Sequence, residues 1–189
     1  IGGGLWSIIY HPEDAPATPY TNWTFSGRIE RMPEFRAPKL GKFGNDVSME
    51  LTVPENAEGV LYALGGFSGG LSCYVKDGYL MYEYNLFEIN RTQIKSKTKL
   101  PTGEDKIEVV SRLTSPKPGS PMDVSLKVNG KEVAKGQVPI TAALTFTAND
   151  CLDLGSDLGS PVSIDYYDSA PFEFNGTLKT TKVWYPKTK

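Results

Sequence analysis

The sequence predicts an all-β fold, an antiparallel two-sheet β-sandwich, on three observations. Apolar and polar residues alternate with a period of two through several segments, which is the pattern of a half-buried strand. Two-residue turn signals join pairs of such segments. Glycine and proline, 19 and 14 of the 189 residues, are spaced so that few windows could hold three helical turns. Roughly ten short strands with turns about every 8–12 residues are typical of two packed sheets.

The strands are expected in the last three-quarters of the chain. Asp77-Gly78 and Asn129-Gly130 each separate two strand-like runs, and such pairs supply the positive φ that a two-residue hairpin turn demands. The glycine-rich stretch 65–70 lacks the Lys-Ser/Thr of a phosphate loop, so we expect a connection in which two backbones approach closely. The expected strands are 47–53, 59–64, 71–75, 79–84, 107–111, 124–128, 131–134 and 176–185.

Residues 1–45 differ from the sandwich expected at 46–189. Five prolines exclude a long helix or a central strand through most of this stretch, and its aromatic content is too high for a free linker. We expect an irregular N-terminal arm, rich in proline and aromatics, that docks on a catalytic domain or on the sandwich. The opening Ile1-Gly2-Gly3-Gly4, without Met, indicates a cut inside a longer polypeptide.

Charge and hydropathy exclude two classes of partner. A net charge of −2 and a pI near 5.5 argue against nucleic acid or an anionic membrane surface. Lys95, Lys97 and Lys99 alternate with Ser96 and Thr98, which favours one solvated face of a strand over a phosphate-binding patch. No apolar run approaches the ~20 residues of a membrane-spanning helix. The compartment, bacterial cytoplasm or periplasm, is not fixed by the sequence.

The order of hairpins resembles a known fold family. The Asp77-Gly78 hairpin precedes Val128-Asn129-Gly130-Lys131 and a closing Phe174-Asn175-Gly176-Thr177-Leu178, as in the concanavalin A-like and laminin-G-like jelly rolls. A narrower set of strings is similar to the region after the catalytic domain of large bacterial arylsulfatases. The strings are Gly2-Gly3-Gly4-Leu5-Trp6, His11-Pro12-Glu13-Asp14-Ala15-Pro16, Tyr20-Thr21-Asn22-Trp23-Thr24-Phe25, Tyr62-Ala63-Leu64-Gly65-Gly66-Phe67-Ser68-Gly69-Gly70, Tyr84-Asn85-Leu86-Phe87 and Asp157-Leu158-Gly159-Ser160-Pro161-Val162.

This resemblance implies a non-catalytic C-terminal domain. The partner would be a sulfatase catalytic domain upstream in the same polypeptide, and that parent would use Ca²⁺ and a formylglycine. A formylglycine comes from a Cys/Ser-x-Pro/Ala/Ser-x-Arg motif, and neither Cys73 nor Cys151 begins one. With two cysteines a disulfide framework is not expected, although one bridge between them is compatible with the sequence. No cofactor is predicted for this chain.

Other catalytic centres are also not expected. A Ser–His–Asp triad would need His11, the only histidine, which lies between Tyr10 and Pro12 in the irregular arm. Glu83 and Glu88 have the outer spacing of a glycosidase acid pair, but on a regular strand they face opposite sides. We therefore expect both to be ordinary strand-surface acids.

Two binding sites are candidates. Asp150, Asp153 and Asp157 are the best metal ligands, because Ca²⁺ takes carboxylate oxygens from loops, and solvated loop acids are the alternative. Exposed aromatics could stack on sugars or dock on a partner, whereas the alternative is that the rings fill the core. These aromatics are Trp6, Tyr20, Trp23, Tyr166 and Tyr167. Two functions follow: a domain that stabilises or shapes a sulfatase catalytic domain, or a module that binds sulfated glycans.

Overall fold

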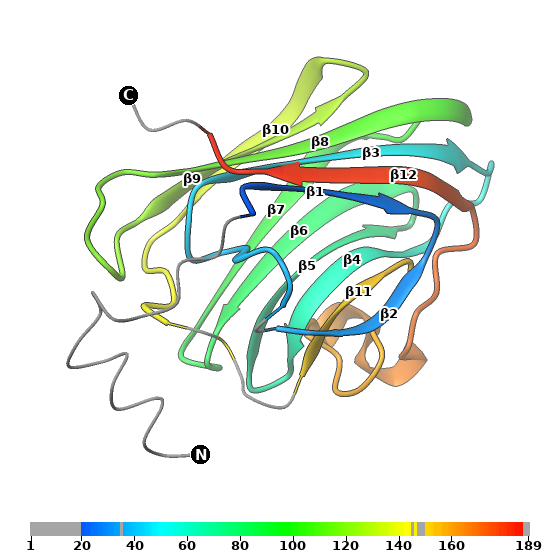
Figure 1. Ribbon diagram of the computed structural model, residues 1–189. Coiled ribbons are helices and arrows are strands. Elements are labelled where there is room, and N and C mark those ends of the chain that lie inside the picture. Colours follow the sequence, from blue (N-terminus) through cyan, green and yellow to red (C-terminus); the bar gives the residue numbers. More distant parts are fainter. Residues whose placement is uncertain (1–19, 35, 145, 147–149, 187–189) are drawn as a thin grey trace.

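The computed structural model describes residues 20–34, 36–144, 146 and 150–186, which form two packed antiparallel sheets of six strands each (Figure 1). Sheet A has the order β1-β12-β3-β8-β9-β10, and sheet B has the order β2-β11-β4-β5-β6-β7. The strands of sheet A are β1 Asn22–Ser26, β3 Asn45–Val53, β8 Gly103–Leu113, β9 Met122–Val128, β10 Lys131–Val138 and β12 Thr177–Trp184. The strands of sheet B are β2 Ile29–Pro33, β4 Gly59–Gly66, β5 Gly69–Lys76, β6 Tyr79–Leu86, β7 Asn90–Lys99 and β11 Cys151–Leu154.

The two predicted hairpin turns are confirmed. Asp77 and Gly78 have φ of 53° and 77°, and Asn129 and Gly130 have φ of 50° and 79°. Positive φ at both central positions is the geometry of a type I′ turn, whose twist matches that of the strands it joins. These turns connect β5 to β6 and β9 to β10 in antiparallel register. The sequence therefore predicts both hairpins correctly, including their turn positions.

The close backbone approach expected in the glycine-rich stretch 65–70 is also present. It forms the turn between β4 and β5, where a Cβ on Gly65 would lie 2.4 Å from the carbonyl oxygen of Gly69. A Cβ on Gly70 would lie 2.5 Å from the carbonyl oxygen of Leu64. Contacts this short exclude side chains, so the glycines are required for packing.

The core lies between the two sheets and follows the period of two. Met49, Leu51 and Ile107 of sheet A are fully buried, as are Cys73 and Leu80 of sheet B. Burying each such side chain stabilises the fold by about 1.5–3 kcal/mol. Both cysteines are free, so the compatible disulfide is not formed. Burial raises the pKa of the Cys73 thiol, which makes it an inert core residue.

The described part of the expected arm belongs to the sandwich. β1 pairs with β12 at one edge of sheet A, and β2 pairs with β11 at one edge of sheet B (Figure 1). Proline-rich segments are restricted to such edge positions, because proline cannot donate to a sheet ladder. The sandwich thus includes two strands before the expected boundary at residue 46. Trp6 and His11 lie outside the described residues.

The sequence did not predict the segment that follows β11. After β11 the chain crosses the outer face of sheet B, meaning the face turned away from sheet A, and forms a 3₁₀ helix at Ile164–Ser169. It buries a second, smaller apolar cluster with members Val60, Ala63, Tyr74, Met81, Val162 and Tyr166. No helix among the described residues is long and apolar enough to cross a membrane.

Candidate functional site

The predicted aromatic contacts do not form one site. Tyr20 is 64% exposed, and Trp23 on β1 is partly buried, with its ring 5.2 Å from that of Tyr185. Both lie at the edge of sheet A, whereas Tyr166 and Tyr167 lie on the 3₁₀ helix over sheet B. Tyr166 and Tyr167 therefore lie over a different sheet from Tyr20 and Trp23.

Tyr166 is a core residue, which corrects its interpretation as a glycan contact. It is 1% exposed, and its hydroxyl donates to Asp157 at 2.6 Å and is hydrogen-bonded to the hydroxyl of Ser72 at 2.9 Å. Its ring stacks on Phe172 and meets Tyr74 edge-on. Both faces are covered, so no sugar can stack there. Tyr167 remains exposed.

The three candidate metal ligands hold loops instead. Asp153 accepts the backbone N–H groups of Arg31 and Leu158, and Asp157 accepts that of Val162 at 2.8 Å. Asp150 accepts from the amide of Cys151 and the hydroxyl of Ser160. Within the described ranges, no group of three or more His, Cys, Asp or Glu side chains is arranged to hold a metal ion. Burial raises the pKa of all three carboxyls, that of Asp157 to about 7.

Glu83 is buried, not a surface acid, which corrects the sequence-based expectation. Its carboxylate accepts from Arg91 and Gln93 at 2.8 and 2.9 Å and from the hydroxyl of Ser163. Tyr74, on the neighbouring strand β5, donates to Asp165 at 2.7 Å. These bonds fasten the segment after β11 to sheet B. Glu88 lies in the exposed turn after β6, so the two acids do not form a catalytic pair.

A groove lies on the outer face of sheet A, the face turned away from sheet B. It has a volume of about 590 Å³ and crosses β8, β9 and β10. The β9–β10 hairpin extends from the top of the sandwich in Figure 1, and a register shift at residues 132–134 marks a bulge in β10. The lining residues are Val110, Arg112, Asp123, Val124, Ser125, Glu132, Lys135, Gly136 and Gln137.

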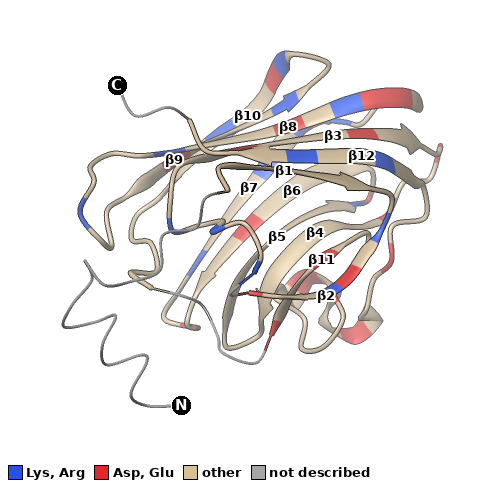
Figure 2. Ribbon diagram, viewed as in Figure 1, with Lys and Arg blue, Asp and Glu red and all other residues tan. Residues whose placement is uncertain are grey.

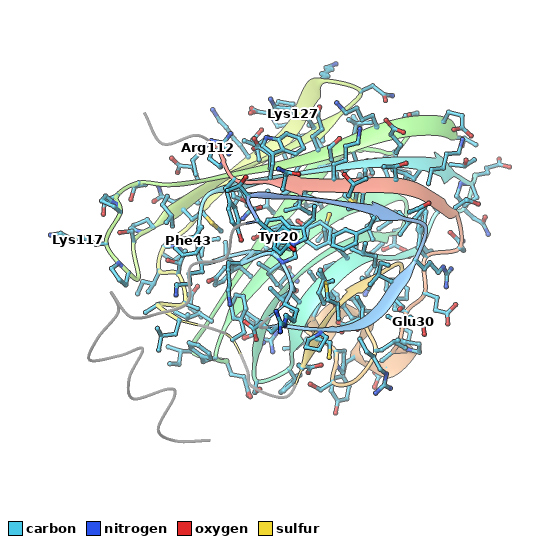
Figure 3. The ribbon with its side chains drawn as sticks, in the orientation of Figure 1. Tyr20, Glu30, Phe43, Arg112, Lys117 and Lys127 are labelled. Carbon is cyan, nitrogen blue, oxygen red and sulfur yellow. The ribbon has the colours of Figure 1, made fainter. Side chains whose placement is uncertain are left out.

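The polar groups of this groove are held in place by hydrogen bonds, two of them between lining residues. Gln137 donates to Asp123 at 2.7 Å, and Ser125 donates to Glu132 at 2.8 Å. Arg112, labelled in Figure 3, forms two bonds to the carboxylate of Asp46, at 2.7 and 3.0 Å. Each of these groups keeps further donors or acceptors that face solvent. The groove therefore presents a fixed array of amide, carboxylate, hydroxyl and guanidinium groups.

Sequence reasoning did not find this groove. Apart from Val124 and Gly136, its residues are the outward members of the alternating pattern in β8, β9 and β10, and such residues are normally just solvated. Their proximity depends on strand order, which the alternation does not encode. One sequence feature could have pointed to the groove: Val110 is an apolar residue at an outward position of β8, where the alternation predicts a polar residue.

The fold is a concanavalin A-like and laminin-G-like jelly roll, and comparison with solved structures supports this class. The chain is similar to the Ruminococcus gnavus IT-sialidase CBM40 bound to α2,3-sialyllactose, with TM-score 0.58 and 13% identity over 88% of this chain and 94% of that one. It is also similar to domains LG4-5 of the mouse laminin α1 chain, with TM-score 0.61 and 14% identity over 89% of this chain and 43% of that one.

A third similar structure is the leech intramolecular trans-sialidase, with TM-score 0.53 and 12% identity over 90% of this chain and 26% of that one. No protein-family model and no curated protein matches the sequence. At these identities the likeness shows the fold alone, and function must be argued from the site.

Proposed function

We propose that this domain is a carbohydrate-binding module whose ligand lies in the groove across β8, β9 and β10. The observation that carries the proposal is the set of polar side chains held at the surface of that groove by mutual hydrogen bonds. The CBM40 of similar fold was solved with sialyllactose, which supports a sugar ligand for this class of sandwich.

Sugar hydroxyls both donate and accept, and adjacent hydroxyls suit planar groups with two polar atoms. Asp123 and Glu132 supply carboxylates, Gln137 an amide and Arg112 a guanidinium, all in one groove. Val110 adds apolar surface for the CH face of a ring. Because these side chains are already fixed, binding costs less ordering entropy than it would with free rotamers.

The test is binding of the full chain to a glycan array, followed by calorimetric titration with the best ligand. The double substitution Asp123→Asn and Gln137→Ala removes a charged acceptor and an amide, so we expect at least about tenfold weaker binding. Glu50→Gln with Thr180→Ala is the matched control, because both residues lie on other strands of sheet A, outside the groove lining. Equal affinity of both variants would contradict the proposal.

We further propose, on the sequence strings alone, that the module is joined to a sulfatase catalytic domain that it stabilises or shapes. On this proposal the chain has no catalytic activity of its own, and Ca²⁺ and formylglycine belong to the parent. The test is the sequence upstream of Ile1. A Cys/Ser-x-Pro/Ala/Ser-x-Arg motif there supports the proposal, and a different upstream domain contradicts it.

A further inference from the structure

The edges of the two sheets meet along a seam between β7 and β10. β7 is an edge strand of sheet B and β10 an edge strand of sheet A, and the two pack together. The packing is tight, since a Cβ on Gly136 would lie 2.8 Å from the side chain of Ile94. Two depressions of about 330 and 350 Å³ follow this seam.

Five exposed lysines line the seam. On β7 the strand period turns Ile94 and Ser96 inward and the lysines outward. Figure 2 marks the basic positions on β7 and on the raised hairpin of β10. The lysines are Lys95, Lys97 and Lys99 on β7 and Lys131 and Lys135 on β10.

Among the described residues, the seam lysines lack the carboxylate partner that Lys106 and Lys179 each have. Lys106 and Lys179 pair with Glu108 and Glu104, whereas none of the five seam lysines forms a salt bridge within the described part of the chain. The carboxylate that lines the seam, that of Glu132, accepts from Ser125. Neighbouring ammonium groups repel one another, and an anion bound between them relieves the repulsion.

Tyr79 holds two of these cations on the outer face of sheet B. The ammonium nitrogen of Lys95 lies 4.2 Å from the centroid of the Tyr79 ring, and that of Lys99 lies 5.8 Å from it. Cation–π attraction at these distances restrains both side chains. The positive charge is thus placed on β7 before any ligand arrives.

The seam is continuous with the groove on sheet A. Lys135 and Glu132 line both the groove and the first seam depression. A polymer that lies across β8, β9 and β10 therefore leaves the groove beside Lys135 and reaches the β7 lysines directly.

We propose that the seam binds the anionic groups of an acidic polysaccharide, sulfate or carboxylate, whose sugar rings occupy the adjoining groove. This inference rests on the proposed function for the groove. Exposed lysines are point charges that bind such groups without fixed geometry. The groove, with its carboxylates and amide but no exposed aromatic pair among its lining residues, suits sugar hydroxyls better than nucleobases.

The test compares four polymers on the full chain: heparin, hyaluronan, neutral dextran and single-stranded DNA. We expect one of the two acidic polysaccharides to bind at least about tenfold more tightly than dextran, with affinity falling steeply as salt rises. Heparin carries both groups, so tighter binding of heparin than of hyaluronan shows that sulfates add affinity, and the reverse shows that carboxylates suffice. DNA binding as tight as that of both polysaccharides would overturn the proposal, because the seam would then be a general polyanion surface.

The seam is tested by replacing Lys95, Lys97 and Lys99 together with Gln. We expect about tenfold weaker binding of the acidic polysaccharide and a salt slope lower by about two to three. Lys117, Lys179 and Lys182, replaced together with Gln, are the control, because the charge change is equal but lies away from the seam. Equal losses in both triple variants would overturn the proposal. Thermal melts establish that both variants are folded.

The outcome for the seam is separable from that for the groove. If a neutral glycan binds and Asp123→Asn with Gln137→Ala abolishes it, while acidic polymers bind no more tightly, the seam proposal fails and the groove stands. If acidic polymers depend on the seam lysines and the groove variant has no effect, the groove proposal fails and the seam remains an anion site.

Discussion

Replacing Asp157 by Asn tests the polar layer beneath the 3₁₀ helix. Asp157 is 1% exposed, and its carboxyl group accepts from the hydroxyl of Tyr166 and the amide of Val162. Burial raises its pKa to about 7, whereas an unfolded chain gives about 3.9. The folded state therefore holds a proton that the unfolded state releases between these two values.

The sign and size of the effect follow from proton linkage. Between about pH 4 and 7 the folded state binds more protons, so the free energy of unfolding falls as pH rises, by about 1.4 kcal/mol per pH unit. Across the whole interval the loss reaches about 4 kcal/mol. The amide of the Asp157→Asn variant is neutral at every pH, and its oxygen can still accept both hydrogen bonds. This variant therefore lacks the loss of stability that the titration of Asp157 causes as pH rises through this range.

The assay is urea denaturation of the wild type and Asp157→Asn at pH 5, 6, 7 and 8. Subtracting the two curves removes the titration of all groups that do not interact with Asp157; the nearby carboxylates of Asp150 and Asp153 add to the rise in its pKa. We expect the free energy of unfolding of the variant to rise relative to that of the wild type as pH rises to about 7. Above that pH the difference should stay constant. Parallel curves across this range would refute the assignment of a protonated Asp157.

Three further changes test the structure. Glu83→Ala leaves Arg91 without its buried partner, so we expect a loss of about 3–5 kcal/mol in urea denaturation. Gly59→Ala places a Cβ 2.2 Å from the carbonyl oxygen of Glu173 at φ +112°, so folding should be lost or weakened by several kcal/mol. Gly130→Ala, at φ +79° in open space, should cost only about 1–2 kcal/mol, and an equal loss at both glycines contradicts the steric argument.

Local signals in the sequence predicted the sandwich well. The alternation in 47–53 reflects burial of one strand face, and Asn129-Gly130 has the backbone freedom that its turn requires. Both are properties of neighbouring residues, so they can be read without knowing the fold. The same reasoning failed for Glu83, because its partners Arg91 and Ser163 come from an adjacent strand and from a loop 80 residues away.

The candidate site depends on strand order, and this is why sequence reasoning missed it. The groove joins Arg112, Asp123 and Gln137 from three strands, and the seam joins Lys97 to Lys135 across two sheets. The alternation of Lys95, Lys97 and Lys99 correctly indicated an exposed face, but the lysines of β10 that complete the cluster could not be placed beside it. The Tyr166 prediction failed because its ring is packed against Tyr74 and Phe172, which no local sequence pattern places beside it.

Backbone NMR of the isotope-labelled chain, titrated with the oligosaccharide that binds best on the array, tests the central claim most directly. If the module binds its glycan in the groove, amide shifts concentrate on β8, β9 and β10, around Arg112, Ser125 and Gln137. An acidic oligosaccharide should extend the shifts to Lys95 and Lys97 on β7. Saturable shifts confined to other strands, or no shift with any glycan, would contradict the account.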